Sequence, residues 1–242
     1  MNLVSNAVST AERVNSAVAP PRARPRRASR AAVAALLAVT AMAGLSACSG
    51  GSADGGTAHT GSAAVVGGQR ISVATVQDQV NAFRAAAPAQ GQPATAGQGQ
   101  VYGQDSPGVP TAVLQFLIQS QVVQSALNAK GLSVSASEVT AVESQNAAQL
   151  GGSAQLSSAF VAGTGLPPSD LDAYFRTVVG ETKLVQATGV SQATKQEYDA
   201  DVAKALDAQV AKIGLDVNPR YGSWDAATGG LGAVARPWLK AT

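Results

Sequence analysis

Apolar residues recur every three or four positions through most of the chain after residue 72, which is the spacing of one face of an α-helix. The first such helix carries Val76, Val80 and Phe83 on one face. Ser72 is suited to cap it, and Pro88 stops it. Capping-box patterns that begin at Ser135 and Thr194, prolines, and the glycines Gly131 and Gly214 set the limits of the other helices. These are expected at 111–129, 136–150, 153–162, 171–185 and 195–213.

The helix expected at 111–129 is the longest of these, and it carries no charged residue. Its apolar side chains cover more than one face, so we expect several neighbouring elements to surround it. Four glutamines along it argue against insertion into a membrane. We predict that it is the central helix. The preceding segment, 87–110, is rich in Gly, Gln and Pro and is expected to be a mobile loop.

Short extended segments lie at the two ends of this helical region. The segment at 64–66 is followed by two glycines and a short return, as in a β-hairpin. At the other end, 215–218 is extended before a turn at 219–222. The predicted fold class is therefore mainly α. It is one domain at 64–225 with two or three short β-strands joining its ends, followed by a tail at 226–242.

The start of the chain has a different pattern of charge. Residues 1–47 hold six arginines and a single acid, Glu12, and the run from Ala31 to Ala47 carries no charge. A basic stretch, a short apolar run and then small residues is the layout of a secretory signal. The apolar run is shorter than the roughly 20 residues that a membrane-spanning helix needs. We therefore interpret 1–47 as a signal peptide.

The apolar run ends in Leu45-Ser46-Ala47-Cys48, which resembles the lipobox of bacterial lipoproteins. In that family the cysteine thiol receives a diacylglyceryl group, and a peptidase then cuts directly before the cysteine. The resemblance identifies Cys48, the only cysteine in the chain, as a lipidation site. It implies a protein that acylated Cys48 anchors in the lipid bilayer, on the outer face of the cell membrane.

Removing the signal reverses the charge of the chain. The whole chain has a formal net charge of +2, but six of its 17 Lys and Arg residues lie in 1–47, whereas 14 of its 15 Asp and Glu residues follow. The remaining chain is acidic, and no basic patch suggests that it binds nucleic acid. It opens with a Gly/Ser-rich stretch, 48–63, that we expect to be a flexible tether. His59, the only histidine, lies in this tether.

The order of the segments resembles a known family. The stretch AVVGGQRIS at 64–72 is similar to the start of the SurA-type chaperone domain, which is also found in PrsA-like foldases. The stretch at 111–139 is similar to the family's long helix, glycine break and next capped helix. The stretch LDVNPRYGSWD at 215–225 is similar to its terminal strand and turn. The resemblance implies a SurA N-terminal-like helical domain that binds unfolded or nascent secreted proteins.

In the resembled family the terminal strand returns beside the first strand. A strand of three residues is too short to be stable alone, so we expect 64–66 to pair with 215–218. Trp224 is expected to cover the junction of these segments. Pro219 is expected to end the ladder because proline has no N–H to donate.

Candidate chemistry is sparse in this sequence. Relatives often carry a parvulin prolyl isomerase domain, but here the helical segments leave room only for the loop and short helices. One histidine and one cysteine make no His/Cys active-site set. We therefore expect no enzyme and no cofactor or metal. The aromatic residues of the helices are first a core and second a candidate peptide-binding groove, formed by Phe116, Tyr174, Phe175 and Tyr198.

Three functions remain open from the sequence. The first is a chaperone or foldase-like module that binds polypeptides without catalysis. The second is a peptidyl-prolyl cis-trans isomerase whose catalytic part is lost or disguised. The third is a ligand-binding or structural lipoprotein of the cell envelope. An exposed apolar groove would separate the first function from the third.

The lipobox predicts that the protein isolated from its native host begins with an acylated Cys48 and partitions into detergent. Two or more acyl chains hold a protein stably in a membrane, whereas one chain gives only marginal binding. Mass spectrometry of the N-terminal peptide measures the modification, with Cys48→Ala as the control that should not partition. An unmodified N-terminus at another residue would contradict this prediction.

Overall fold

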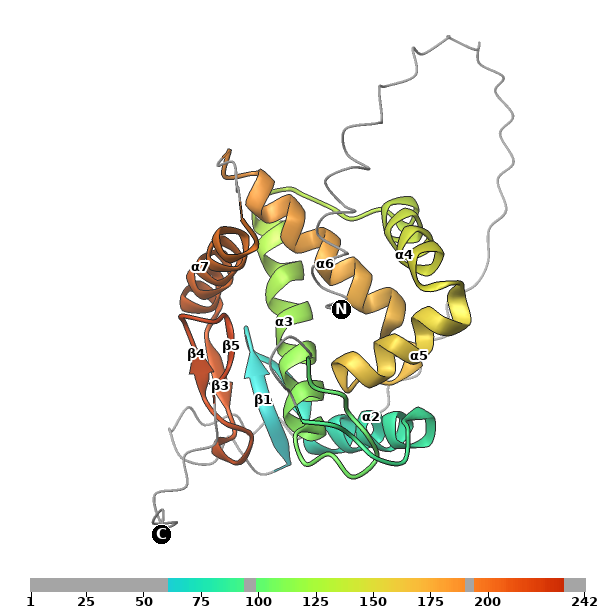
Figure 1. Ribbon diagram of the computed structural model, residues 1–242. Helices are drawn as coiled ribbons and strands as arrows, with labels where there is room; N and C mark the ends of the chain where they lie inside the picture. Colours follow the sequence, from blue (N-terminus) through green and yellow to red (C-terminus); the bar gives the residue numbers. More distant parts are fainter. Residues whose placement is uncertain (1–60, 94–98, 190–193, 233–242) are drawn as a thin grey trace, which may run out of the picture.

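Helix α3 runs through the middle of the structure, and the other elements lie around it (Figure 1). The structure is a computed structural model that describes residues 61–93, 99–189 and 194–232. The expected signal peptide, Cys48 and the first part of the expected tether lie outside the described residues. The helices are α2 (Val73–Ala86), α3 (Val109–Ala129), α4 (Ala136–Leu150), α5 (Ser153–Thr164), η1 (Pro168–Asp170), α6 (Leu171–Gln186), α7 (Lys195–Ile213) and η2 (Pro219–Tyr221). The strands are β1 (Ser62–Val66), β2 (Gln69–Ser72), β3 (Leu215–Val217), β4 (Trp224–Asp225) and β5 (Gly230–Leu231).

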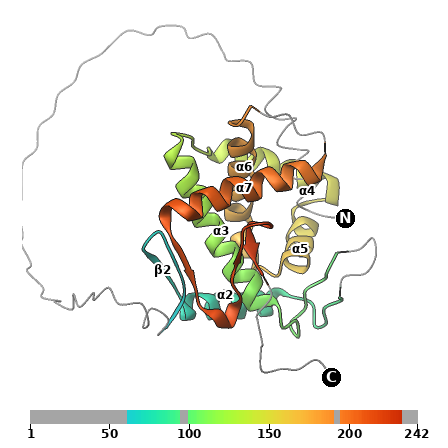
Figure 2. The same cartoon turned by 90° about the vertical axis from the view of Figure 1, so that its left-hand side faces the viewer.

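The prediction of a central uncharged helix is confirmed. Helix α3 buries nine of its residues, and it contacts α2, α6, α7, β1, β5 and η2. Figure 2 shows α7 crossing α3 on one side, with α2 below both. The helix begins at Val109, two residues before the expected start, because Pro110 is tolerated in a first turn, where its missing N–H has no helical partner.

The predicted helix caps are confirmed. The side chains of Ser72, Ser135 and Thr194 each accept a hydrogen bond from a backbone N–H in the first turn of the helix that follows. Beyond the end of α3, Gly131 has a φ of 65°, and the N–H of Leu132 reaches back to the carbonyl of Leu127 at 2.9 Å. A left-handed residue of this kind is a common helix stop that favours glycine.

The expected pairing of the two ends is also confirmed. Strand β1 lies between β2 and β3 in an antiparallel sheet, with Ala64 opposite Val217. The ladder continues for one residue past β3, where Asn218 N–H donates to Ala63 O at 3.0 Å and Asn218 Nδ2 donates to Ser62 O at 3.1 Å. Pro219 follows directly, in η2. The sheet therefore joins two segments that are about 150 residues apart in the chain.

The expected domain limits need correction at both ends. Ser62 and Ala63, assigned to the tether, belong to β1 and are fully buried. The expected tail is folded up to residue 232, because β5 pairs with β4. A Cβ on Gly230 would lie 2.9 Å from Gln115 Nε2, so the hairpin lies directly on α3. Sequence patterns miss this hairpin because its strands have only two residues each, which is too short for an alternation of apolar and polar positions to be seen.

Trp224 lies in this hairpin, in β4. Its indole N–H donates to Asp207 Oδ1 of α7 at 3.2 Å, and its ring packs against the main core. The indole therefore ties the hairpin to α7.

The loop expected at 87–110 is folded where it is described. Gln92 and Val101 exchange two backbone hydrogen bonds, of 2.7 and 2.8 Å, and Asp105 accepts a bond from Gly91 N–H at 2.9 Å. Tyr102 N–H donates to Ala162 O at 2.7 Å, which fixes the loop on α5. Residues 94–98 lie outside the described residues. The described parts of this loop, residues 87–93 and 99–108, are therefore hydrogen-bonded to each other and to the rest of the domain.

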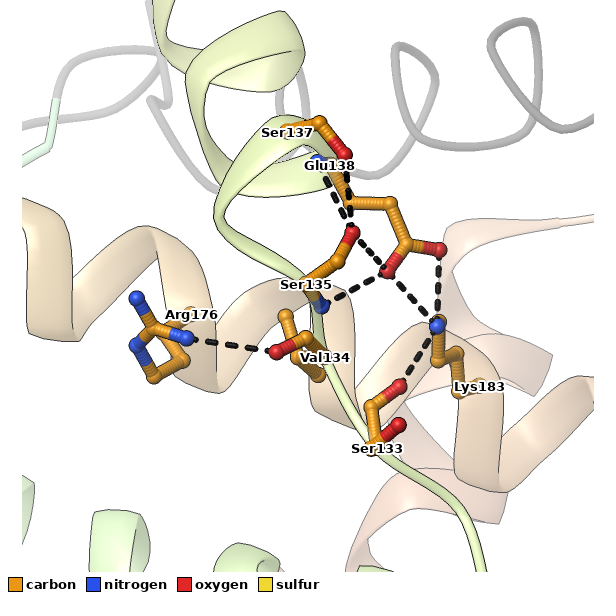
Figure 3. Close-up of polar contacts among 7 residues, drawn as sticks. All are labelled: Ser133, Val134, Ser135, Ser137, Glu138, Arg176 and Lys183. Carbon is orange, nitrogen blue, oxygen red and sulfur yellow. Dashed lines mark hydrogen bonds and ion pairs between the residues drawn. The ribbon is translucent and has the colours of Figure 1, made fainter. Parts of the chain in front are cut away.

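Helices α4 and α5 form a smaller core with one side of α6. Figure 3 shows how the segment before α4 is fixed to α6: Lys183 Nζ donates to Ser133 O at 2.7 Å and pairs with Glu138 at 2.7 Å. Burial alone would raise the pKa of Glu138, but hydrogen bonds from Lys183 and Ser135 outweigh it and lower the pKa. Across the described ranges, no helix combines the length and apolarity needed to cross a membrane.

The sheet that joins the ends predicts the effect of changes at Asn218. Asn218→Ala removes the bond to Ser62 O and the bond that Asn218 Oδ1 accepts from Arg220 N–H. We expect the free energy of unfolding to fall by about 1–3 kcal/mol, the usual cost of losing such bonds. A chain that stops after Gly214 should lose more stability, since it lacks β3 and the hairpin. Urea unfolding measures both effects.

Asn218→Asp is the matched variant for this prediction. Aspartate keeps the acceptor for Arg220 N–H but has no N–H for Ser62 O. Its stability should therefore lie between that of the wild type and that of Asn218→Ala. If all three chains unfold at the same urea concentration, the side chain of Asn218 does not support the sheet.

Candidate functional site

A hollow of about 440 Å³ opens beside the N-terminal half of α3. We call it the α3–α6 hollow, since side chains of both helices line it. Its volume lies in the range of sites that hold small ligands or a few side chains. Its apolar walls come from the loop, α3, the segment after α5, α6 and β5, through Tyr102, Ala112, Phe116, Leu166, Tyr174 and Leu231.

The polar lining of the α3–α6 hollow is uncharged. Thr111, Gln115 and Gln119 project from one side of α3, at helical spacing, and Thr164 closes the end of α5. No Asp, Glu, Lys or Arg is among the described residues that line it. Amide and hydroxyl groups both donate and accept hydrogen bonds, which are the bonds that a peptide backbone makes.

Tyr174 is at the centre of an aromatic cluster below the hollow. The centroid of its ring lies 5.2 Å from the ring centroid of Phe160 and 5.6 Å from that of Phe175, both in edge-on pairs. The ring centroid of Phe116 lies 6.4 Å away, in a tilted pair. Edge-on pairs at these distances are favourable beyond the area they bury. The Tyr174 hydroxyl is buried and has no hydrogen-bond partner among the described residues.

The four aromatic residues predicted as a groove divide into two pairs. Phe116 and Tyr174 line the α3–α6 hollow, as expected of a binding site. Phe175 and Tyr198 do not line it. Phe175 is 1% exposed in the smaller core, and Tyr198 is 6% exposed with its hydroxyl 3.2 Å from Thr182 Oγ1. Phe116 is itself only 7% exposed, so Tyr174 is the more accessible of the first pair. Helix α6 is buried on several faces, so helical spacing alone does not separate its core side from its groove side.

A buried carboxyl group lies behind the polar wall. Glu181 of α6 is 7% exposed, and its Oε1 accepts a hydrogen bond of 2.5 Å from Gln119 Nε2. Its neighbour Gly180 explains how it comes so close to α3, since a Cβ there would lie 2.7 Å from Val123 Cγ1. Burial raises the pKa of Glu181 to about 7, the bond from Gln119 opposes this, and the charge of Asp199 adds to it.

The Glu181 carboxyl acts on the Tyr174 phenol, which belongs to a residue that lines the hollow. Burial and then the nearby Glu181 carboxyl raise the pKa of the Tyr174 phenol far above its usual range. The two residues are seven positions apart on α6, so they lie on the same face. Gln119, Tyr174 and Glu181 thus form one buried polar cluster, two of whose members line the hollow.

Sequence reasoning missed Glu181, although the sequence contains a signal for it. Glu181 falls on the apolar stripe that runs through Tyr174, Val178 and Val185. An acid on such a stripe is a candidate for burial, because charged residues are rarely placed there without a partner. A second buried acid, Asp170 before α6, is 8% exposed and accepts a hydrogen bond from Gln79, and burial raises its pKa.

A second hollow, of about 490 Å³, lies between the β1–β2 turn and the other side of α3. Amide and hydroxyl side chains such as Gln121, Gln124 and Asn128 line it, and it contains no aromatic side chain. Its apolar lining comes from Val66 and Ile213. Among the described residues, no cluster of His, Cys, Asp and Glu is arranged to hold a metal ion.

Comparison with known families agrees with this architecture. The sequence model of the SurA-like N-terminal domain matches residues 24–165, more than half of the 242-residue chain. The chain belongs to this family, which is of chaperone type and acts on polypeptides. The match takes in α2 to α5, begins earlier than the resemblance noted from 64 onward, and ends before α6. No curated protein and no solved structure matches the chain.

The buried carboxyl predicts how stability depends on pH. The folded chain holds the proton of Glu181 up to about pH 7, whereas the unfolded chain releases it near 4.5. Stability from this group is therefore full below pH 4.5 and is lost as the pH rises through about 7. Glu181→Gln should remove this loss and stabilise the protein at pH 8 by up to about 3 kcal/mol.

Thermal unfolding of both proteins at pH 5 and pH 8 tests this prediction. Glu143→Gln on α4 is a matched control, because Glu143 is partly exposed and does not line the hollow. It should keep the pH dependence of the wild type. An equal loss of stability between pH 5 and pH 8 in wild type and Glu181→Gln would show that Glu181 is not the group responsible.

Proposed function

We propose that this protein is a membrane-anchored, extracytoplasmic chaperone that binds unfolded exported polypeptides in the α3–α6 hollow, without catalysis. One observation carries the proposal: the lining of the hollow combines aromatic side chains with uncharged amide and hydroxyl groups. The family supports it, since SurA-like N-terminal domains belong to proteins of chaperone type. The proposed clients are unfolded or nascent secreted proteins.

The lining of the hollow suits a polypeptide more than a small charged ligand. Apolar side chains of an unfolded client gain free energy when they leave water for the surfaces of Phe116, Tyr174 and Leu231. Gln115 and Gln119 are placed to bond the client backbone, which every sequence shares. Ordering an unfolded chain costs free energy, so binding should be weak and tolerant of sequence. Both properties suit a chaperone that must release its clients.

The anchoring and the lack of catalysis rest on the sequence. Cys48 and the Leu45-Ser46-Ala47 run before it support lipidation, which would place the hollow outside the cell membrane on a tether. The only histidine and the only cysteine both precede β1. The domain itself therefore offers neither residue for the His/Cys chemistry of a parvulin-type isomerase. This favours a binding module over an enzyme.

Filling the hollow should abolish client binding. Thr111→Trp places an indole in the mouth of the α3–α6 hollow from a partly exposed position. The variant made from residues 49–242, which contain every described element, should no longer suppress the aggregation of a thermally unfolding client. Light scattering at equal chaperone concentrations measures the effect, and circular dichroism checks that the variant is folded.

Ser120→Trp is the matched control for this prediction, since Ser120 is also partly exposed on α3 but lines the second hollow. It should suppress aggregation like the wild type. If Ser120→Trp abolishes suppression and Thr111→Trp does not, the clients bind in the second hollow.

The wild-type protein should not accelerate proline cis-trans exchange in a tetrapeptide, which takes tens to hundreds of seconds without a catalyst. An acceleration that grows with protein concentration would contradict the absence of catalysis.

A further inference from the structure

The buried polar cluster of Gln119, Tyr174 and Glu181 connects the α3–α6 hollow to a group that can gain or lose a proton. Gln119 and Tyr174 face the hollow, and Glu181 lies behind Gln119 and is bonded to it. The cluster holds a buried carboxyl and a buried phenol hydroxyl that lacks a partner among the described residues. Burying such groups costs free energy unless they are hydrogen-bonded.

The charges around Glu181 do not neutralise it. Helix α3 carries no Asp, Glu, Lys, Arg or His. From α7, Glu181 feels the acidic Asp199, whose own ion pair is with Lys195. On α6, Lys183 is engaged by Glu138 of α4 and by the carbonyl of Ser133. The carboxylate form of Glu181 is therefore held in the interior by the Gln119 amide, with a second acid on α7 acting against it.

We propose that Glu181 is a proton-controlled switch of the α3–α6 hollow, in which the neutral acid favours a bound client and the carboxylate favours its release. This inference rests on the proposed function, since it assigns a regulation to the same site. A client seated over Gln119 and Tyr174 excludes water from the floor of the hollow. Removing water disfavours the charged form of a buried acid. Client binding and proton uptake by Glu181 are therefore coupled, and each promotes the other.

The Gln119 amide adds a second reason for the same direction. In the structure, Gln119 Nε2 donates to the carboxyl oxygen of Glu181, so the carboxylate uses a donor of the side chain that lines the hollow. A neutral Glu181 carries its own O–H and can donate to the amide oxygen of Gln119. The Gln119 amide can then turn its N–H groups to the carbonyl groups of a client. When Glu181 is neutral, the Gln119 N–H groups are thus available to a client, whereas the carboxylate occupies one of them.

Calorimetric titration with a fixed peptide tests the switch in residues 49–242. The probe is an apolar peptide with blocked ends and no histidine, so it has no group that titrates between pH 6 and pH 8. If the bound peptide raises the pKa of Glu181 by one unit, the wild-type affinity should fall about fivefold from pH 6 to pH 8. Titration at pH 7 in two buffers of different ionisation enthalpy should show proton uptake on binding.

Two variants, with Glu143→Gln as their control, make the result specific to Glu181. Glu181→Gln should bind with an affinity that does not change between pH 6 and pH 8 and should take up no proton, whereas Glu143→Gln should behave like the wild type. Asp199→Asn removes the charge that disfavours the carboxylate, so the midpoint of the affinity change should move to lower pH. This second variant keeps Glu181 in place, so it tests the switch even if Glu181→Gln fails to fold.

The outcomes separate this inference from the proposed function. If the wild type binds the peptide and Glu181→Gln keeps the same fall in affinity and the same proton uptake, the switch is overturned and the client site stands. If the wild type does not bind the peptide at pH 6 or at pH 8, the client site itself is wrong, and the switch falls with it. Binding that is coupled to protons only when Glu181 is present supports both.

Discussion

Burying an uncharged helix against neighbours on several sides is the constraint on which this structure depends. Helix α3 has no charge to keep in water, so α2, α6, α7, the first strand and the C-terminal hairpin all pack on it. Two of these approaches are made with glycine. A Cβ on Gly180 would overlap Val123, and one on Gly230 would lie 2.9 Å from Gln115. The positions of α6 and of the hairpin are therefore set by the surface of α3.

The same close packing creates the candidate site. Gly180 brings α6 against α3, and the next residue, Glu181, is thereby buried beside Gln119. Packing alone would favour an apolar residue at this position, since a buried acid with a raised pKa lowers stability at neutral pH. The glutamines of α3 lower its apolar character, and two of them, Gln115 and Gln119, line the hollow. Gln119 connects the two features, since it donates to the buried Glu181 and also lines the hollow.

The family match and the hollow cover different parts of the chain. The match ends at residue 165, whereas Tyr174 of the floor and Leu231 of the rim lie beyond it. The part shared with the family provides the central helix and the loop that carries Tyr102. The rest of the hollow comes from α6 and from the hairpin, which return to α3 from far along the chain. Part of the proposed client site therefore lies outside the part of the chain that defines the family.

The sequence by itself determined the local structure. Ser72, Ser135 and Thr194 placed helix starts, Gly131 and Gly214 placed helix ends, and the uncharged run at 111–129 identified the central helix, because each depends on neighbours within one or two turns. The family resemblance and the short strand lengths also indicated that the two ends pair. Only the tertiary structure decided which aromatic residues face a hollow, that Glu181 is buried against Gln119, and that the residues after 225 fold onto α3. Those features depend on how closely distant segments approach. That distance is set by glycines and by packing across the domain, which local periodicity does not encode.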